Sequence, residues 1–354
     1  MVRRMMEKKI KVLIIDDSKL IRRAVTEMLH SEPDIEIIGE AADAYEGRDK
    51  IVYLNPDVVI LDIEMPRMDG LTFLEKLMKS KPMPVIIFSS LAKGRSKYEY
   101  KAYDLGAVGV VAKPAQQTNL AEIKDTIADL IRTSSRLSAT QLRLLKNRRI
   151  TAVQTPENPK DYLMSKPIIA IGASTGGTHA IRKIMAKLPE KFPPIVMVQH
   201  MPENFTTQFA ARLNEISRLH VVEAQGGEQL VNGTAFLAPG GKHLEVIKKG
   251  AFYYTRVFDG PLVHHQKPAV EILFDSVAKY AKNDAVGIIL TGMGADGAKG
   301  LLNMKNNGAH TIAQDEKSSI VFGMPKEAIK LQAAQKILDL KEIPTSLFRY
   351  LEGL

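Results

Sequence analysis

Three side chains in the second half of the chain have the types and the placement that hydrolysis of an ester requires. Ser174 follows the apolar run IIAIGA, His200 ends the run PIVMVQH, and Asp296 follows the run VGIIL. Because parallel strands bring their carboxyl ends to one edge of a sheet, we expect these three residues to meet there. A serine hydroxyl is a weak nucleophile until a base takes its proton, and a carboxylate can orient that base. The placement therefore favours a hydrolytic triad of nucleophile, general base and orienting acid.

Each of these residues also has a competing interpretation. The turn GASTGG around Ser174 suits a phosphate-cradling loop or a plain glycine turn, although neither G-x-G-x-x-G nor G-x-x-x-x-G-K-[ST] fits it. His200 could be a buried, hydrogen-bonded imidazole, and Asp296 could cap the next helix. The adjacent His264 and His265 are weak evidence for a metal, because no third ligand stands at a recognisable spacing.

A second set of polar residues follows strand-like runs near the start of the chain. Asp16 and Asp17 come after KVLII, Asp62 after DVVIL, Ser89 after PVIIF and Lys113 after AVGVV. Three carboxylates at one sheet edge repel one another unless a cation is present, and Mg²⁺ is a hard ion that takes few carboxylates and keeps waters. The set predicts a Mg²⁺ site at which Asp62 accepts a phosphoryl group, supported by the Lys113 charge and the Ser89 hydroxyl. A helix cap is the competing interpretation for any single aspartate.

The elements that must position these residues predict two α/β domains. Residues 1–130 contain five strand-like runs that alternate with helical patterns, which indicates a doubly wound sheet. Residues 166–352 repeat the alternation, and the shorter runs between 233 and 258 predict antiparallel hairpins beside a mainly parallel sheet. A helix near 119–132 is followed by residues 131–165, which we interpret as a basic linker. Within it, Leu137, Leu144 and Leu145 give a weak pattern for a short amphipathic helix, and Leu142 falls to one side of that apolar face.

Composition limits the classes of protein that need be considered. The chain has 354 residues, 45% apolar and 25% charged, with no cysteine, which excludes disulfides and thiol catalysis. It has no run of eighteen apolar residues and no signal peptide, so we expect a cytoplasmic protein without membrane insertion.

The net charge of +9 makes a nucleic-acid partner worth considering. Much of the excess lies in residues 132–150, which contain six basic residues and no acid: Arg132, Arg136, Arg143, Lys146, Arg148 and Arg149. That segment could bind an acidic partner or form a solvated face. A DNA-binding regulator is disfavoured because no helix-turn-helix pattern follows the first domain, and a nucleotide-binding module that uses GASTGG is the other alternative. We therefore expect no nucleic-acid partner.

The first domain closely resembles the receiver domain of two-component response regulators. The resemblance rests on DDS at 16–18, DIEMPRMDG at 62–70 and KP at 113–114. It implies a flavodoxin-like fold in which Asp16 and Asp17 bind Mg²⁺, Asp62 is phosphorylated by a histidine kinase, and Ser89 and Lys113 support the phosphorylated state. Where many receivers have an aromatic switch residue, three positions before the lysine, this chain has valine at position 110.

The second domain resembles the catalytic domain of the chemotaxis protein-glutamate methylesterases. The resemblance rests on GASTGG, QHMP, LAPGG, TGMGADG and AQDE…VFGMP. It implies catalytic roles for Ser174, His200 and Asp296, an oxyanion contribution from the Met293 backbone N–H, and a pocket lined by Thr175.

The resemblance also implies the reaction and its partners. Members hydrolyse glutamate methyl esters of chemoreceptors, release methanol, commonly deamidate particular receptor glutamines, and need no cofactor for the hydrolysis. This chain departs from the family at His179, where an acidic residue is frequent, and in HHQKPAVEILF, which differs from the usual arginine-bearing form. We expect a monomer in which the receiver restrains the esterase until Asp62 is phosphorylated by the chemotaxis kinase.

Overall fold

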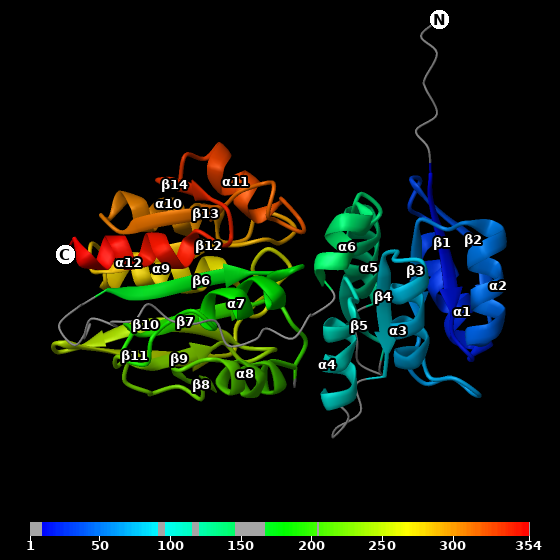
Figure 1. Ribbon diagram of the computed structural model, residues 1–354, viewed down its shortest axis with the longest axis horizontal. Helices are drawn as coiled ribbons and strands as arrows, with labels where there is room; N and C mark the ends of the chain where they lie inside the picture. Colours follow the sequence, from blue (N-terminus) through cyan, green and yellow to red (C-terminus); the bar gives the residue numbers. More distant parts are fainter. Residues whose placement is uncertain (1–8, 91–95, 115–119, 146–166, 204, 354) are drawn as a thin grey trace, which may run out of the picture. The chain divides into compact units, whose positions relative to one another are not determined.

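The computed structural model describes residues 9–90, 96–114, 120–145, 167–203 and 205–353. The chain divides into two compact units, residues 1–147 and 148–354 (Figure 1).

The first unit is built on a five-stranded parallel sheet in the order β2-β1-β3-β4-β5. This order confirms the predicted flavodoxin-like, doubly wound fold. Helices alternate with the strands along the chain. The elements are β1 (Ile10–Ile15), α1 (Lys19–Leu29), β2 (Ile35–Ala41), α2 (Ala44–Leu54), β3 (Val58–Leu61), α3 (Gly70–Ser80), β4 (Val85–Ser89), α4 (Ser96–Leu105), β5 (Gly109–Ala112), α5 (Leu120–Ser134) and α6 (Ala139–Leu145).

The chain folds this way because the central strands are apolar on both faces. All four residues of β3 and all five of β4 are buried, as a parallel sheet covered by helices on both sides requires. The strand order reverses at β1 and β3, and this switch point is where ligands collect in open α/β sheets.

The first unit extends beyond residue 130, where the sequence predicted its end. Residues 131–145 of the predicted linker lie in α5, in α6 and in the turn between them, and the rest of that linker lies outside the described residues. Leu142, expected to one side of the apolar face, is 2% exposed, and Leu145 is buried too; the side chain of Leu144 lies outside the described residues. Arg132 pairs with Asp34, so part of the predicted basic segment is neutralised within this unit.

The second unit is built on a seven-stranded sheet in the order β14-β13-β12-β6-β7-β9-β8, and every recorded strand pair in it is parallel. A separate antiparallel pair joins β10 to β11. The elements are β6 (Ile168–Ala173), α7 (Gly177–Met185), β7 (Ile195–Gln199), α8 (Phe205–Ile216), β8 (His220–Glu223), β9 (Thr234–Leu237), β10 (His243–Lys249), β11 (Phe252–Phe258), α9 (Val270–Tyr280), β12 (Ala285–Ile289), α10 (Ala298–Asn306), β13 (His310–Gln314), α11 (Met324–Lys330), β14 (Lys336–Leu338) and α12 (Ile343–Glu352).

The prediction of a mainly parallel sheet with an antiparallel hairpin is confirmed, with one correction. The sequence placed β9 among the antiparallel hairpins, but β9 lies between β7 and β8 and pairs with both in parallel. A short apolar run such as TAFL has the same pattern in either kind of pairing, so periodicity alone could not distinguish them.

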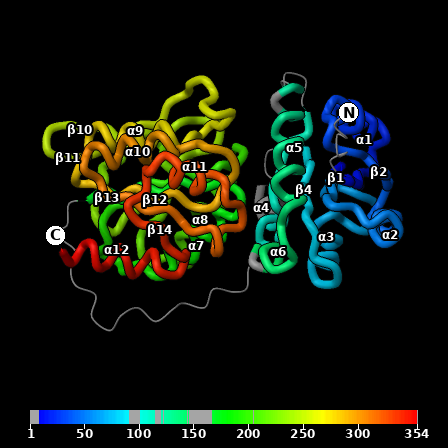
Figure 2. Tube along the Cα trace, turned by 90° about the horizontal axis from the view of Figure 1, so that it is seen from above, coloured from blue at the N-terminus to red at the C-terminus, as the bar shows by residue number. Residues whose placement is uncertain are grey.

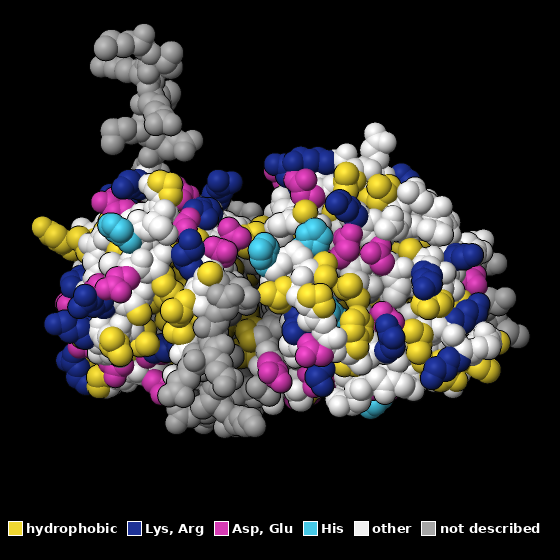
Figure 3. All heavy atoms as spheres, turned by 180° about the vertical axis from the view of Figure 1, so that it is seen from behind, with side chains coloured by type: hydrophobic (Ala, Val, Ile, Leu, Met, Phe, Trp, Pro, Cys, Tyr) yellow, Lys and Arg dark blue, Asp and Glu magenta, His cyan; other side chains and the backbone are white. Residues whose placement is uncertain are grey.

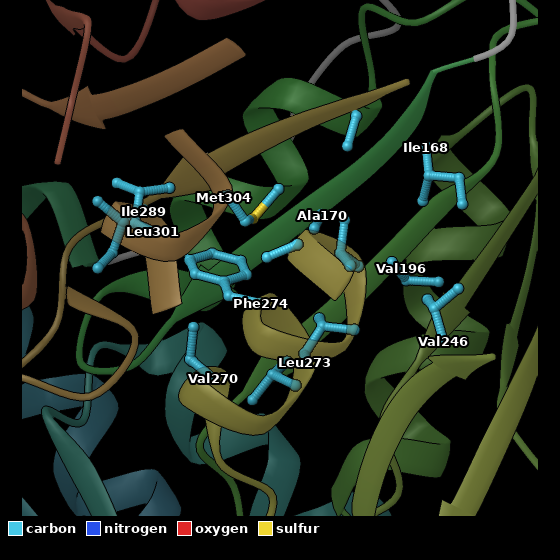
Figure 4. Packing of buried hydrophobic residues seen from close by; sticks show 14 of the residues in the cluster. Ile168, Ala170, Val196, Val246, Val270, Leu273, Phe274, Ile289, Leu301 and Met304 are labelled. Carbon is cyan, nitrogen blue, oxygen red and sulfur yellow. The ribbon is translucent and has the colours of Figure 1, made fainter. Parts of the chain in front are cut away.

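Helices cover both faces of this sheet. Figure 2 shows α9 and α10 on one side of the strands and α7 and α12 on the other. Val270, Leu273 and Phe274 of α9 are fully buried, and Figure 4 shows them in one cluster with Leu301 and Met304 of α10. This packing fixes the N-terminus of α9 against the carboxyl edge of the sheet, where the candidate site lies.

The surface carries both signs of charge. On the face shown in Figure 3, the Lys and Arg side chains are interspersed with Asp and Glu rather than gathered into one stripe. Among the described residues, none of the helices combines the length and the apolarity that a membrane span requires.

Candidate active site and receiver site

Ser174, His200 and Asp296 follow three strands that are neighbours in the sheet. Ser174 comes after β6, the central strand of the three, and its N–H bonds to Thr291 O beyond the end of β12 at 3.0 Å. On the other side His200 N donates to Ala173 O of β6 at 3.1 Å. These bonds continue the sheet past its regular strands and place Ser174 and His200 at the same edge, and Asp296 joins them there through its bond to the His200 ring.

His200 and Asp296 form a buried pair. The His200 Nε2 atom lies 2.8 Å from Asp296 Oδ2, and the two side chains are only 7% and 3% exposed. Because Nε2 is hydrogen-bonded to Asp296, the other ring nitrogen, Nδ1, is the atom that can bond to a nucleophile. The pair has the geometry of an oriented base and its acid.

The N-terminus of α9 holds the Asp296 carboxylate. Oδ2 accepts a hydrogen bond from Val270 N at 2.7 Å, and Oδ1 accepts one from Glu271 N at 2.9 Å. These are first-turn N–H groups that have no partner inside the helix, and the helix dipole favours a negative charge at this end. Burial alone would raise the pKa of Asp296, but the bonds from His200 and from these two N–H groups hold it below its ordinary value. Asp296 therefore stays ionised beside the imidazole.

A glycine loop lies directly against Ser174. A Cβ atom on Gly292 would lie 2.7 Å from Ser174 Cβ and 2.3 Å from Met324 Sδ, so only glycine fits there. Met293, predicted to give an oxyanion N–H, is the next residue of that loop and is half-buried. Thr175, predicted to line the pocket, is half-buried as well, and its carbonyl accepts a bond from Thr291 Oγ1 at 2.9 Å.

Gln199 is a site residue that the sequence analysis did not single out. Its side chain is buried, and Nε2 donates to Ser174 O at 2.9 Å and to His200 O at 3.1 Å. One amide group thus links the backbone of Ser174 to that of His200. Gly177 lies so close that a Cβ there would be 2.1 Å from Gln199 Oε1. The available signal was a glutamine at the end of the apolar run PIVMVQ.

Three other histidines of this unit lie in different settings. His243 is a buried structural imidazole: Nε2 donates to Pro261 O at 2.8 Å and Nδ1 accepts from Ala269 N at 3.3 Å. His179 lies on α7, where burial and the charges of Lys183 and Arg182 lower its pKa to about 4. His264 has a ring nitrogen within 4.8 Å of carboxylate oxygens of Glu271 and Asp296.

The predicted phosphorylation site gathers at the switch point of the first unit. Asp62 N donates to Ile15 O at 2.8 Å, which sets Asp62 beside the end of β1 and hence beside Asp16. Lys113 Nζ lies 2.7 Å from Asp16 Oδ2 and 2.9 Å from Asp62 Oδ2. Ser89 is the buried last residue of β4, and its carbonyl accepts a bond from Lys113 N at 2.9 Å. Asp17 is the exposed member of the acidic cluster.

The acidic residues of this site fit a hard divalent ion. One carboxylate oxygen each of Asp16, Asp17 and Asp62 lies within 4.8 Å of the others, and the buried Asp62 Oδ1 accepts no hydrogen bond from the described residues. Burial raises the pKa of Asp62 to about 6 although the Lys113 ammonium opposes this shift. Burial in turn lowers the pKa of Lys113, but its bonds to both aspartates outweigh that effect and leave it above the ordinary value. Asp62 thus combines a carboxylate oxygen that accepts no hydrogen bond from the described residues with a nearby cation, an arrangement that suits a phosphoryl acceptor.

Comparisons with known proteins cover both units. The family profile described as CheB methylesterase matches residues 169–347, and the profile described as response regulator receiver domain matches residues 12–124. A protein-glutamate methylesterase/protein-glutamine glutaminase 2 of Syntrophus aciditrophicus is 49% identical over 96% of this chain and 99% of its own length. A protein-glutamate methylesterase/protein-glutamine glutaminase of Yersinia pestis is 47% identical over 95% of each chain. The crystal structure of the Thermotoga maritima CheB methylesterase catalytic domain is 38% identical with a TM-score of 0.51, over 54% of this chain and 100% of that one.

Proposed function

The chain belongs to the CheB methylesterase family and carries a response regulator receiver domain in the same polypeptide, and from this we propose that it is a phosphorylation-regulated serine hydrolase. Its activity is that of a protein-glutamate methylesterase, which releases methanol from glutamate methyl esters of chemoreceptors, and of a protein-glutamine glutaminase, which deamidates receptor glutamines. This activity serves adaptation in chemotaxis. The observation that carries the proposal is the buried His200–Asp296 pair, 2.8 Å apart, at the strand ends that present Ser174.

In the proposed reaction Ser174 Oγ attacks the ester carbonyl carbon while His200 takes the hydroxyl proton. Since Nε2 bonds to Asp296, Nδ1 is the atom that accepts this proton. Asp296 holds the ring orientation and stabilises the imidazolium that forms. The negative oxygen of the tetrahedral intermediate is assigned to the Met293 N–H, with Thr175 lining the same pocket; an oxyanion donor of this kind is worth about 10²–10³ in rate.

The intermediate then expels its leaving group. The bond to the methoxy oxygen breaks, His200 returns its proton, and methanol departs from the acyl-enzyme. A water molecule attacks the acyl carbon, gives a proton to His200, and releases a free glutamate as Ser174 recovers its hydrogen. A glutamine side chain follows the same path with ammonia in place of methanol. Water is the only co-reactant, so we propose no cofactor for hydrolysis.

The receiver is proposed to carry the regulatory phosphoryl group on Asp62. Asp16, Asp17 and Asp62 would hold Mg²⁺, which supplies positive charge to the phosphoryl oxygens when it is bound. Lys113 reaches Asp62 at 2.9 Å and can pair with the phosphoryl group. Ser89 follows the neighbouring strand and is proposed to hydrogen-bond the product.

The proposed partners follow from these two activities. The substrates are methylated chemoreceptors, and the phosphodonor is the chemotaxis histidine kinase. The enzyme is proposed to act in the cytoplasm as a monomer, without nucleic acid and without insertion into a membrane.

The test is methanol release from methylated receptor helices by the purified chain. Wild type should release methanol, and Ser174→Ala should release almost none while it keeps its fold by circular dichroism. Ser217→Ala is a matched control because its hydroxyl bonds to Leu219 N at 3.1 Å, outside the site, and it should behave as wild type. Activity of Ser174→Ala at a tenth or more of wild type would show that another group is the nucleophile.

A further inference from the structure

Asp296 has a second histidine near it besides His200. One ring nitrogen of His264 and one carboxylate oxygen each of Glu271 and Asp296 lie within 4.8 Å of one another. The reaction proposed above uses neither His264 nor Glu271. These three residues are called the His264 cluster below.

The two carboxylates of the cluster are fixed rigidly. Glu271 N donates to Asp296 Oδ1 at 2.9 Å, and Gly297 N donates to Glu271 Oε2 at 3.0 Å, so the first turn of α9 and the loop before α10 hold each other. Asp296 is 2% exposed and Glu271 is 9% exposed.

The imidazole of the cluster is presented by a short closed turn. Val263 N bonds to Gln266 O at 3.1 Å and Gln266 N bonds to Val263 O at 2.9 Å, with His264 and His265 as the two residues between them. Both histidines have left-handed backbone angles, with φ of 52° and 60°, a conformation that asparagine and glycine adopt more readily. His264 is exposed, so an ion from solvent can reach its imidazole.

We propose that His264, Glu271 and Asp296 form a binding site for a divalent transition-metal ion such as Zn²⁺, and that the bound ion inhibits the esterase. One imidazole nitrogen and two carboxylate oxygens are donors that Zn²⁺ accepts at three positions, with water at the fourth. The mixed nitrogen and oxygen set distinguishes this site from the all-oxygen cluster of the receiver, which suits Mg²⁺.

Inhibition follows from the place of Asp296 and therefore rests on the proposed function. The bonds from Val270, Glu271 and His200 occupy both oxygens of the carboxylate, but Oδ1 receives only one of them and has a lone pair that an ion could use. A cation there withdraws the negative charge that would stabilise the His200 imidazolium. The ion would slow the acyl-transfer steps without touching Ser174.

The test uses the full chain with its receiver saturated by Mg²⁺. Zn²⁺ is titrated by calorimetry into Ser174→Ala and into the same chain with His264→Gln or His265→Gln added. His265→Gln is the matched control because it lies in the same turn but outside the cluster. Co²⁺ replaces Zn²⁺ in a second titration, since its visible absorption reports nitrogen and oxygen ligands without any enzymatic readout.

We expect one Zn²⁺ equivalent that is lost or weakened at least tenfold by His264→Gln and kept by His265→Gln. In chains with Ser174 intact, Zn²⁺ should lower methanol release at least tenfold in wild type and in His265→Gln, and less than twofold in His264→Gln. Equal Zn²⁺ binding by the two histidine variants would overturn the site. Binding without inhibition would overturn the inhibitory role, and because binding is measured without Ser174, a failure of the esterase assignment would be seen separately.

Discussion

Replacing Asp296 by asparagine separates the charge of this side chain from its shape. The carboxylate accepts hydrogen bonds from His200 Nε2 at 2.8 Å, Val270 N at 2.7 Å and Glu271 N at 2.9 Å. The first two reach one oxygen and the third reaches the other. An asparagine amide offers one oxygen and one NH₂ group, so in either orientation at least one N–H of α9 faces another donor.

This mismatch sets the expected loss of stability. A buried donor without an acceptor costs about 1–3 kcal/mol, and we expect the free energy of unfolding of Asp296→Asn to fall by that amount at pH 7. The pKa of Asp296 in the folded protein lies below its ordinary value. The stabilisation from its charge is therefore present above the unfolded pKa of about 3.9 and is lost as the pH falls through the folded pKa, so the deficit of the variant should shrink in acid.

The expected loss of activity is larger. A neutral amide cannot stabilise the imidazolium, and in one orientation it presents a donor that fixes the wrong tautomer of His200. Removing this charge from a comparable triad costs about 10⁴ in kcat, and we expect a loss of about 10²–10⁴ here with little change in KM. The assays are methanol release and urea unfolding.

Asp275→Asn is the control for that experiment. Asp275 is exposed on the same helix and accepts a bond from Asn303 Nδ2 at 2.7 Å, away from the triad. The free energy of unfolding of Asp275→Asn should stay within about 0.5 kcal/mol of wild type, and the kcat of this variant should stay within twofold of wild type. A kcat for Asp296→Asn within tenfold of wild type would refute the role given to this carboxylate.

Three further outcomes are expected. Gln199→Leu removes the amide that bridges the Ser174 and His200 carbonyls, so kcat should fall about tenfold and stability by about 1–3 kcal/mol, and unchanged values for both would deny its positioning role. The pKa of His179 is about 4 in the folded protein and about 6.5 in the unfolded chain, so the unfolded state binds more protons between these two pH values. The free energy of unfolding should therefore fall by about 2 kcal/mol from pH 7 to pH 5. Urea unfolding of His179→Gln should show a smaller fall. Acetyl phosphate with Mg²⁺ should stimulate methanol release by wild type but not by Asp62→Asn, whereas stimulation of both would move the phosphorylation site elsewhere.

The sequence by itself determined the strands that carry the site. β6, β7 and β12 are buried along their whole length, and a strand buried on both faces must be an apolar run that periodicity can locate. Ser174 and His200 follow their runs directly and Asp296 stands in the loop after β12, so their place at the carboxyl edge of the sheet could be predicted. The acidic cluster and Lys113 of the receiver were found for the same reason.

The partners of those residues were decided only by the tertiary structure. Asp296 bonds to N–H groups of α9 that lie 25 and 26 residues earlier in the chain, and His264 approaches it from a turn still further back. Local pattern carries no information about which helix end meets which loop, because that depends on strand order and on the packing of α9 against the sheet. For the same reason, the sequence could not predict that β9 pairs in parallel with β7 and β8. It also could not predict the bridge made by Gln199, because the two backbone carbonyls that accept its hydrogen bonds come together only on folding.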